Sequence, residues 1–252
     1  MGFLHEGHLS LMREARERAG QVVTSIFVNP TQFARREDLA IYPRDAEGDL
    51  AKCEDVGVDA VYLPEAEAVY ADGHATRVTV DRLTEPLCGR FRPGHFEGVT
   101  TIVAKLINVV EPDLAFFGEK DFQQLAVLRR MVADLDMGVA IVGMPTVRED
   151  DGLALSSRNA RLAPAERQAA TCLHRALLAA GAAHASGERG AREIERVALR
   201  VVDAEPLAGP QYVEVRDARD LAAVERCEGP VVLAMAVHVG STRLIDNVVL
   251  GR

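Results

Sequence analysis

The sequence lacks paired cysteine motifs, long apolar runs and an excess of positive charge. Its four cysteines are scattered with no C-x-x-C pair, so we expect buried or incidental thiols of a reducing cytosol. We expect neither a membrane span nor a signal peptide, and therefore a cytoplasmic protein, because no hydrophobic stretch approaches the necessary length. The net charge of −9 argues against a general nucleic-acid binder, since backbone phosphates require a basic surface.

Two common nucleotide-binding loops are also missing. The chain contains neither G-x-x-x-x-G-K-[ST] nor G-x-G-x-x-G, so a Walker ATPase and a dinucleotide dehydrogenase both lack their defining loop. The composition, 48% hydrophobic and 27% charged, is nevertheless that of an ordinary globular protein.

Helical and strand patterns alternate through residues 1–146. Helices are predicted at 8–20, ending on Gly20 as a C′ residue, and at 44–57, 98–112 and 121–135, the last with Leu135 facing inward. Strands are predicted at 21–29, 58–64, 113–117 and 139–145, where apolar runs are typical of strands buried on both faces. The alternation predicts an α/β domain with an open, doubly wound, mostly parallel sheet.

Residues 147–252 follow a different pattern. An alanine-rich helix is predicted over 164–185 with Pro164 in its first turn, and a second helix over 190–206. Three short strands follow at 211–217, 229–240 and 241–251. Helices followed by neighbouring antiparallel strands indicate a separate, smaller α+β domain.

The opening "MGFLHEGHLS" places His5 and His8 around Gly7, where a loop turns into the first helix. Glycine lets a backbone approach a phosphate, and imidazoles can donate to phosphoryl oxygens. A zincin site is excluded, because H-E-x-x-H requires histidines four residues apart on a formed helix. The alternative is that two polar residues decorate an exposed terminus.

Three further polar clusters follow predicted strands or the domain break. "FVNPTQF" places Asn29 and Gln32 at a strand end, where amides suit a substrate with hydroxyls and a carboxylate, although a turn or cap is the alternative. "FFGEKDFQQL" brings Lys120 to a strand tip, where an ammonium can neutralise a phosphoryl oxygen. "LALSSRN" combines two hydroxyls with Arg158, suited to gripping phosphates, or is a serine-rich linker.

Together, "MGFLHEGHLSL", "SIFVNPTQF", "FGEKDFQQL", "PTVRE…GLALSSRN" and "TRLIDN" resemble the pantothenate synthetase family of H-x-G-H nucleotidyltransferases over essentially the whole chain. The resemblance implies a Rossmann-like ATP- and pantoate-binding domain, a C-terminal lid domain carrying the LSSR loop, and a homodimer. It also implies a reaction: ATP and pantoate, with Mg²⁺, give pantoyl adenylate and pyrophosphate, and β-alanine then releases pantothenate and AMP.

The resemblance also implies a set of site residues. His8, His5, Lys120 and Arg158 would be catalytic, and Gln32, Gln124 and Asn29 would hold pantoate or β-alanine. ATP would contact the four catalytic residues. It would also contact Met1, Gly2, Phe3, Leu4, Glu6, Gly7, Gly118, Glu119, Asp121, Val147, Leu155, Ser156 and Ser157. Tyr42, Arg92 and His95 would lie near the cleft. The metal would bind mainly through the ATP phosphates rather than through protein ligands.

Family members carry a strand before this Met-Gly pair, so we expect the first strand of the sheet to be absent, through a misplaced start codon or a truncated chain. Two alternatives to the ligase stay open. One is another H-x-G-H adenylyltransferase, and the other is a nucleotide-binding remnant impaired by loss of that strand.

Overall fold

The computed structural model describes residues 2–33, 39–40 and 42–251, which form two compact units. The N-terminal unit comprises residues 1–85, 89–119 and 124–145, and the C-terminal unit comprises 86–88, 120–123 and 146–252. The sequence does not reveal that the short segments 86–88 and 120–123 group with the C-terminal half. The assignment of a function to each predicted domain stays a prediction.

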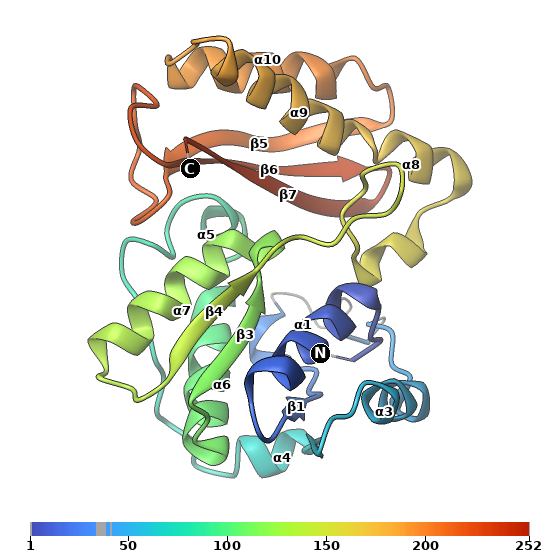
Figure 1. The fold of residues 1–252 in the computed structure, drawn as a ribbon, viewed down its shortest axis with the longest axis vertical. Helices are drawn as coiled ribbons and strands as arrows, with labels where there is room; N and C mark the ends of the chain where they lie inside the picture. Colours follow the sequence, from blue (N-terminus) through green and yellow to red (C-terminus); the bar gives the residue numbers. More distant parts are fainter. Residues whose placement is uncertain (1, 34–38, 41, 252) are drawn as a thin grey trace. The chain divides into compact units, whose positions relative to one another are not determined.

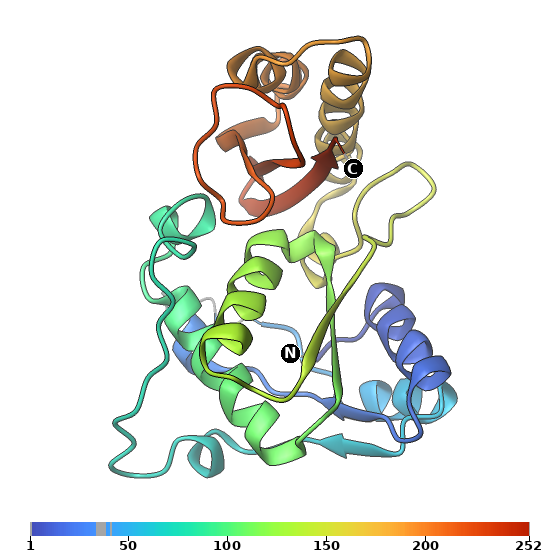
Figure 2. The same ribbon diagram turned by 60° about the vertical axis from the view of Figure 1, so that its left-hand side comes forward.

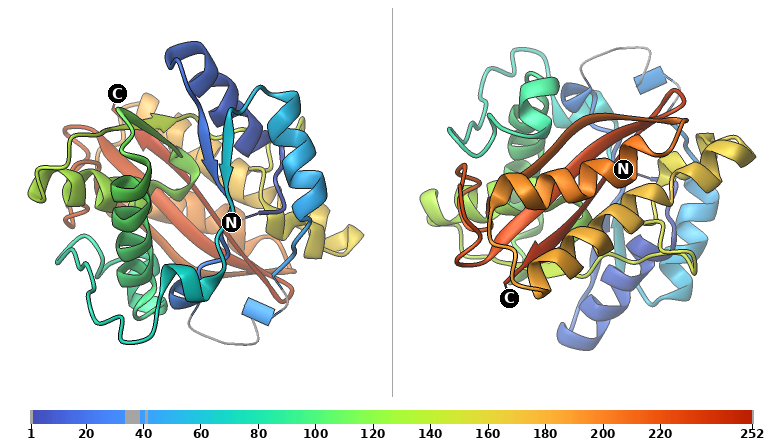
Figure 3. Two further views of the ribbon diagram at one scale, coloured as in Figure 1. Left: turned by 90° about the horizontal axis from the view of Figure 1, so that it is seen from below. Right: turned by 90° about the horizontal axis from the view of Figure 1, so that it is seen from above.

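The N-terminal unit contains two pairs of parallel strands (Figure 1 and Figure 3). Strand β1 (Val23–Ser25) pairs with β2 (Ala60–Tyr62), and β3 (Leu114–Gly118) pairs with β4 (Ala140–Met144). Parallel strands require crossover connections, and the helices between these strands supply them. The predicted α/β class with parallel strands is therefore confirmed.

The helices of residues 1–146 begin with α1 (Glu6–Arg18), η1 (Pro30–Gln32), α3 (Ala46–Asp55) and α4 (Ala66–Val69). They continue with α5 (Cys88–Phe91), α6 (His95–Val110), η2 (Glu119–Asp121) and α7 (Phe122–Asp134). Figure 2 shows α6 and α7 alongside β3 and β4. The helix predicted over 98–112 corresponds to α6, and its apolar residues Val99, Ile102, Val103 and Ile107 are all buried.

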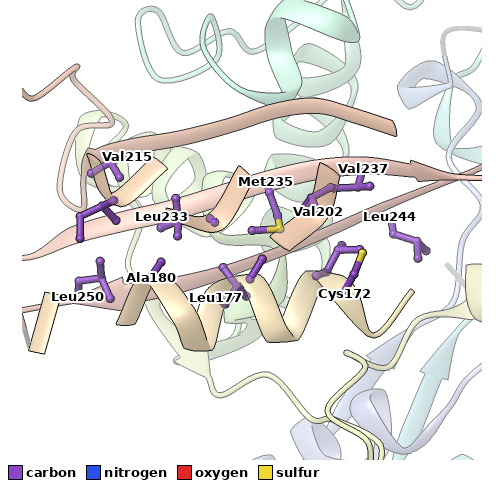
Figure 4. Close-up of a cluster of buried hydrophobic side chains, with 14 of the residues drawn as sticks. Cys172, Leu177, Ala180, Val202, Val215, Leu233, Met235, Val237, Leu244 and Leu250 are labelled. Atoms are coloured by element: carbon purple, nitrogen blue, oxygen red, sulfur yellow. The ribbon is translucent and has the colours of Figure 1, made fainter. Parts of the chain in front are cut away.

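The C-terminal unit packs two helices on one face of an antiparallel sheet. Its elements are η3 (Ser157–Arg161), α8 (Pro164–Ala169), α9 (Cys172–Ala185), α10 (Ala191–Asp203), β5 (Ala208–Asp217), β6 (Val231–Val239) and β7 (Thr242–Leu250). The strand order is β5-β6-β7. Alternate residues of the central strand β6, among them Leu233, Met235 and Val237, meet side chains of α9 and α10 in a continuous core (Figure 4). The predicted three antiparallel strands are confirmed.

Three sequence predictions are wrong in detail. Leu135 is exposed, because α7 ends at Asp134. The helix predicted over 164–185 is two helices, and at the break the Thr171 hydroxyl donates to the Gln168 carbonyl. Gly20 does not adopt the left-handed conformation of a C′ residue; instead Arg16 donates to the carbonyls of Ala19 and Gly20.

The prediction that the cysteines are buried thiols is confirmed. All four cysteines are free and buried, and burial raises the pKa of the Cys172 thiol to about 11. This thiol therefore stays protonated at neutral pH, as expected for a packing residue. Over the residues that the structure describes, none of the helices is both long and apolar enough to span a membrane.

Two adjacent leucines of α9 provide a matched test of the C-terminal core. Leu177 is 3% exposed and Leu178 is 59% exposed. We expect Leu177→Ala to lower the free energy of unfolding by about 2–5 kcal/mol, because it leaves a cavity, and Leu178→Ala to change it by no more than about 0.5 kcal/mol. Urea denaturation measures both, and equal losses would contradict the packing described.

Candidate functional site

The two N-terminal histidines form one structural element. His5 is the N-cap of α1, its backbone N–H donates to Nδ1 of His8 at 3.2 Å, and the two ring centroids lie 4.0 Å apart. Because Nδ1 of His8 accepts this bond, the ring proton of neutral His8 is assigned to Nε2. The turn thus fixes the tautomer that can donate from Nε2. Glu6, in contrast, forms an exposed ion pair with Arg13.

A buried carboxylate holds the turn that precedes these histidines. Asp49 of α3, which is 1% exposed, accepts the backbone N–H groups of Phe3 at 2.7 Å and Leu4 at 2.6 Å. Lys52 lies 3.8 Å from this carboxylate and donates to the Leu4 carbonyl. Gly2 and Phe3 both have positive φ, a conformation that costs energy at Phe3. The two charge-assisted bonds to Asp49 offset that cost.

The polar residues after β1 are held by α6. Asn29 is 1% exposed; its Nδ2 donates to the Gly98 carbonyl at 3.0 Å, and its Oδ1 accepts from Thr31 and from the Tyr70 hydroxyl. Gly98 is required at this contact, because a Cβ there would lie 2.7 Å from the Thr31 carbonyl. The segment carrying Gln32 therefore rests directly on the α6 backbone.

Two further residues that the resemblance implied converge on Gln32. The carbonyl oxygen of Gln32 lies 2.9 Å from Nδ1 of His95 and accepts from Arg92 at 3.4 Å. The Arg92 guanidinium also lies 3.0 Å from Nε2 of His95. Tyr42 is buried and packs edge-on against Phe33, directly after Gln32. The cationic group of Arg92 thus lies beside the predicted pantoate residue.

Lys120 lies in η2, immediately after β3, and its carbonyl accepts from Nδ2 of Asn247 at 2.9 Å. The following glutamines differ in role. Gln123 is buried, donates to the Pro86 carbonyl and accepts from the Cys88 N–H. Its amide is therefore a structural link, whereas the next residue, Gln124, is half-buried on α7.

The loop that carries Arg158 follows a short hairpin over 147–155. The Leu155 N–H donates to the Val147 carbonyl, and Gly152 turns the chain with a φ of 89°. Arg167 of α8 donates to both Glu149 and Asp151, an ion pair that lowers the pKa of Asp151. Ser156 then caps η3, and Arg158 lies in the first turn of η3.

The structure places the remaining predicted residues on the same elements. Gly7 lies in the first turn of α1, Gly118 is the last residue of β3, and Glu119 and Asp121 lie on either side of Lys120 in η2. Ser156 caps η3 through its hydroxyl, which accepts from the N–H of Arg158, and Ser157 is the first residue of η3. Met1 lies outside the described residues.

Several residues that support the site were missed at the level of sequence. Asp49, Tyr70 and Gly98 act on segments that lie 41 to 69 positions away in the chain, and their local sequence gives no signal of it. Asp246 and Asn247 lie within "TRLIDN", but the motif alone does not say what they contact. Each is found only when the chain is folded.

The parallel strand pairs, and a histidine turn that opens a helix, are typical of an α/β protein that binds nucleotide phosphates. Comparison with known proteins makes the class specific. The family model for pantoate-beta-alanine ligase matches residues 1–249. The chain belongs to the pantoate–β-alanine ligase family and is an enzyme of that family.

Named relatives agree with this membership. The chain is 55% identical to a pantothenate synthetase of Pelobacter propionicus over 251 residues, which is 100% of this chain and 88% of that protein. It is likewise 55% identical to the pantothenate synthetase of Geobacter sulfurreducens, covering 89% of that protein.

Solved structures agree as well. The crystal structure of pantothenate synthetase from Thermus thermophilus has a TM-score of 0.95 at 45% identity, covering 98% of this chain and 90% of that one. The pantoate-beta-alanine ligase of Francisella tularensis, solved with beta-gamma ATP and beta-alanine, has a TM-score of 0.80 at 30% identity, covering 98% and 86%.

The role of Asp49 in holding the histidine turn can be measured directly. We expect Asp49→Asn to speed amide hydrogen exchange at Phe3 and Leu4 by about tenfold or more, because the amide group replaces one acceptor with a donor. Asp45→Asn is the matched control, since Asp45 caps the same helix through the Gly48 N–H and does not contact the turn. Equal exchange rates in both variants would contradict the anchor.

Proposed function

We propose that this chain condenses pantoate with β-alanine, using ATP, through a pantoyl-adenylate intermediate, and releases AMP and pyrophosphate. Its membership of the pantoate–β-alanine ligase family over residues 1–249 carries this proposal. The Francisella tularensis relative solved with beta-gamma ATP and beta-alanine supports ATP and β-alanine as substrates. The fixed His8 tautomer supports phosphate binding at the N-terminal turn.

In the first step, a pantoate carboxylate oxygen attacks the α-phosphate and the bond to the pyrophosphate oxygen breaks. The enzyme positions the reactants and neutralises charge, so no covalent nucleophile is required. His8 donates from Nε2 to a phosphoryl oxygen, with His5 beside it, while Lys120 and Arg158 neutralise the departing pyrophosphate.

In the second step, the amine of β-alanine attacks the acyl carbon of the mixed anhydride. The carbon–oxygen bond to AMP breaks, an amide forms and the amine loses a proton. Gln32 and Gln124 hold pantoate through both steps. Asn29 supports Gln32, because its own amide already bonds to Gly98, Thr31 and Tyr70.

Magnesium is proposed to arrive with ATP. Where the chain is described, no group of three or more His, Cys, Asp or Glu side chains could hold a metal ion, and a magnesium ion usually binds through substrate phosphates and water. It would neutralise phosphate charge.

We also propose a cytoplasmic homodimer in which residues 1–146 bind ATP and pantoate and residues 147–252 form a lid.

The decisive experiment supplies the purified chain with ATP, Mg²⁺, pantoate and β-alanine. We expect AMP and pantothenate in equal amounts, with neither formed when pantoate or β-alanine is omitted. His8→Gln should lower turnover about 10²–10⁴-fold, since it removes the proposed phosphoryl donor. ATP binding by calorimetry without pyrophosphate release would indicate a nucleotide-binding remnant, and AMP attached to a phosphate ester would indicate a different adenylyltransferase.

The contact between α6 and the Gln32 segment yields a second kinetic prediction. Gly98→Ala forces a Cβ to within 2.7 Å of the Thr31 carbonyl, so the segment must shift. We expect the KM for pantoate to rise about tenfold while the KM for ATP is unchanged.

Gly181→Ala is the matched control for this substitution. Gly181 also lies within a helix, but a Cβ there meets nothing within 4 Å. It should leave both KM values unchanged and stabilise the chain by about 0.5–1 kcal/mol. An unchanged pantoate KM in Gly98→Ala would contradict the placement of Gln32 at the substrate.

A further inference from the structure

Two successive residues of β7 direct polar side chains to opposite faces of the C-terminal sheet. Asp246 is 3% exposed and Asn247 is 8% exposed. Adjacent side chains of a strand alternate between faces, and each of these two meets a different segment of the C-terminal unit. Buried polar groups in a strand destabilise the fold unless they form hydrogen bonds, so what they bind shows why they are present.

Asp246 binds the root of the hairpin that leads into Ser156. Arg148 donates to both of its carboxylate oxygens, Nη1 to Oδ2 at 2.6 Å and Nη2 to Oδ1 at 2.9 Å. The same Nη1 donates to the Gly152 carbonyl at 3.1 Å, across the hairpin turn. One guanidinium therefore ties β7 to both arms of the hairpin through a bidentate pair with fixed geometry.

The hairpin has little freedom to move around this pair. Gly152 packs against His174 of α9 so closely that a Cβ would lie 2.0 Å from the ring. The Arg148 and Ala154 backbones pair across the hairpin, and Ser156 follows two residues after Ala154. The position of Arg158 thus depends on the bond between Asp246 and Arg148.

Asn247 binds the other cationic segment. Its Nδ2 donates to the carbonyl of Lys120 at 2.9 Å, 127 positions away in the chain. Its own backbone N–H donates to Oδ1 of Asp246 at 2.8 Å. The carboxylate that fixes Arg148 therefore also fixes the strand position from which the Asn247 amide reaches Lys120.

We propose that Asp246 and Asn247 are a shared pair of positioning residues for the two segments that carry Lys120 and Arg158. The proposal rests on the proposed function, in which those two cations neutralise the departing pyrophosphate. Neither residue is proposed to touch substrate. Each acts through another residue, Asp246 through Arg148 and the hairpin, Asn247 through the backbone of Lys120. A displacement of either segment should lower the rate of adenylation more than the affinity for β-alanine.

A double-mutant cycle on Asn247 tests one arm. We expect Asn247→Ala to slow pantoate-dependent pyrophosphate release about tenfold in the natural chain, and by no more than about twofold in a Lys120→Ala background, where there is no ammonium left to position. The KM for β-alanine should stay unchanged. Asn247→Asp, which keeps the side-chain shape, repeats the cycle if the alanine variant does not fold.

A second double-mutant cycle pairs Asp246→Asn with Arg158→Ala. We expect Asp246→Asn to slow pyrophosphate release about tenfold in the natural chain and by no more than about twofold in the Arg158→Ala background. Val248→Ala is the control for lost packing, since Val248 packs against the hydrophobic core of the C-terminal unit; it should lower the melting temperature and leave the rate unchanged. Equal slowing by Asn247→Ala or Asp246→Asn in both backgrounds would overturn the proposal. If Lys120→Ala and Arg158→Ala themselves leave the rate unchanged, the proposed roles of those cations fail instead.

Discussion

The bonds from Asp49 to the N–H groups of Phe3 and Leu4 are the constraint on which the histidine turn depends. In the proposed function this turn binds phosphate, which requires a backbone held in one conformation before the ligand arrives. A neutral side chain would hold it less firmly, because charge-assisted hydrogen bonds are about twice as strong as neutral ones. Burial at 1% exposure excludes the water that would compete. Asp246 serves the hairpin of the C-terminal unit in the same way.

Features encoded by neighbouring residues could be predicted from the sequence. The run at 113–117 covers all of β3 except Gly118, the run at 139–145 contains β4, and the apolar face of α6 is buried, because period and composition are local properties. The histidines lie where the sequence places them, at the junction of a loop and the first helix, but α1 begins at Glu6, two residues before the predicted start, so Gly7 lies inside the helix. The family resemblance, which the family model confirms, supplied the function that these patterns alone leave open.

Features that depend on distant contacts could not be predicted. Nothing near Asn247 indicates Lys120, and nothing near Asp49 indicates Phe3, because each pair is joined only by the fold. The break in the predicted helix 164–185 has a local cause instead. Thr171 lies at the break of a helix that its alanine-rich surroundings favour, and its hydroxyl bonds to a carbonyl there. Gln123 and Gln124 are neighbours in one motif, yet it is the Gln123 amide that forms hydrogen bonds with the distant segment 86–88.

The hydrogen bonds that Asn29 already forms show whether this residue supports the site or can bind substrate. The Asn29 carbonyl oxygen has two lone pairs and already receives Thr31 and Tyr70, while its amide nitrogen donates to Gly98 and lies 3.5 Å from Gln32. A substrate hydroxyl could bond to Asn29 only by displacing one of these buried partners, which would leave that partner unsatisfied. Asn29 therefore fixes where Gln32 lies, and in the proposed function the pantoate contact is assigned to Gln32. The same reasoning explains why Tyr70, which carries no motif, belongs to the site: its hydroxyl completes the set of bonds that holds Asn29 in place.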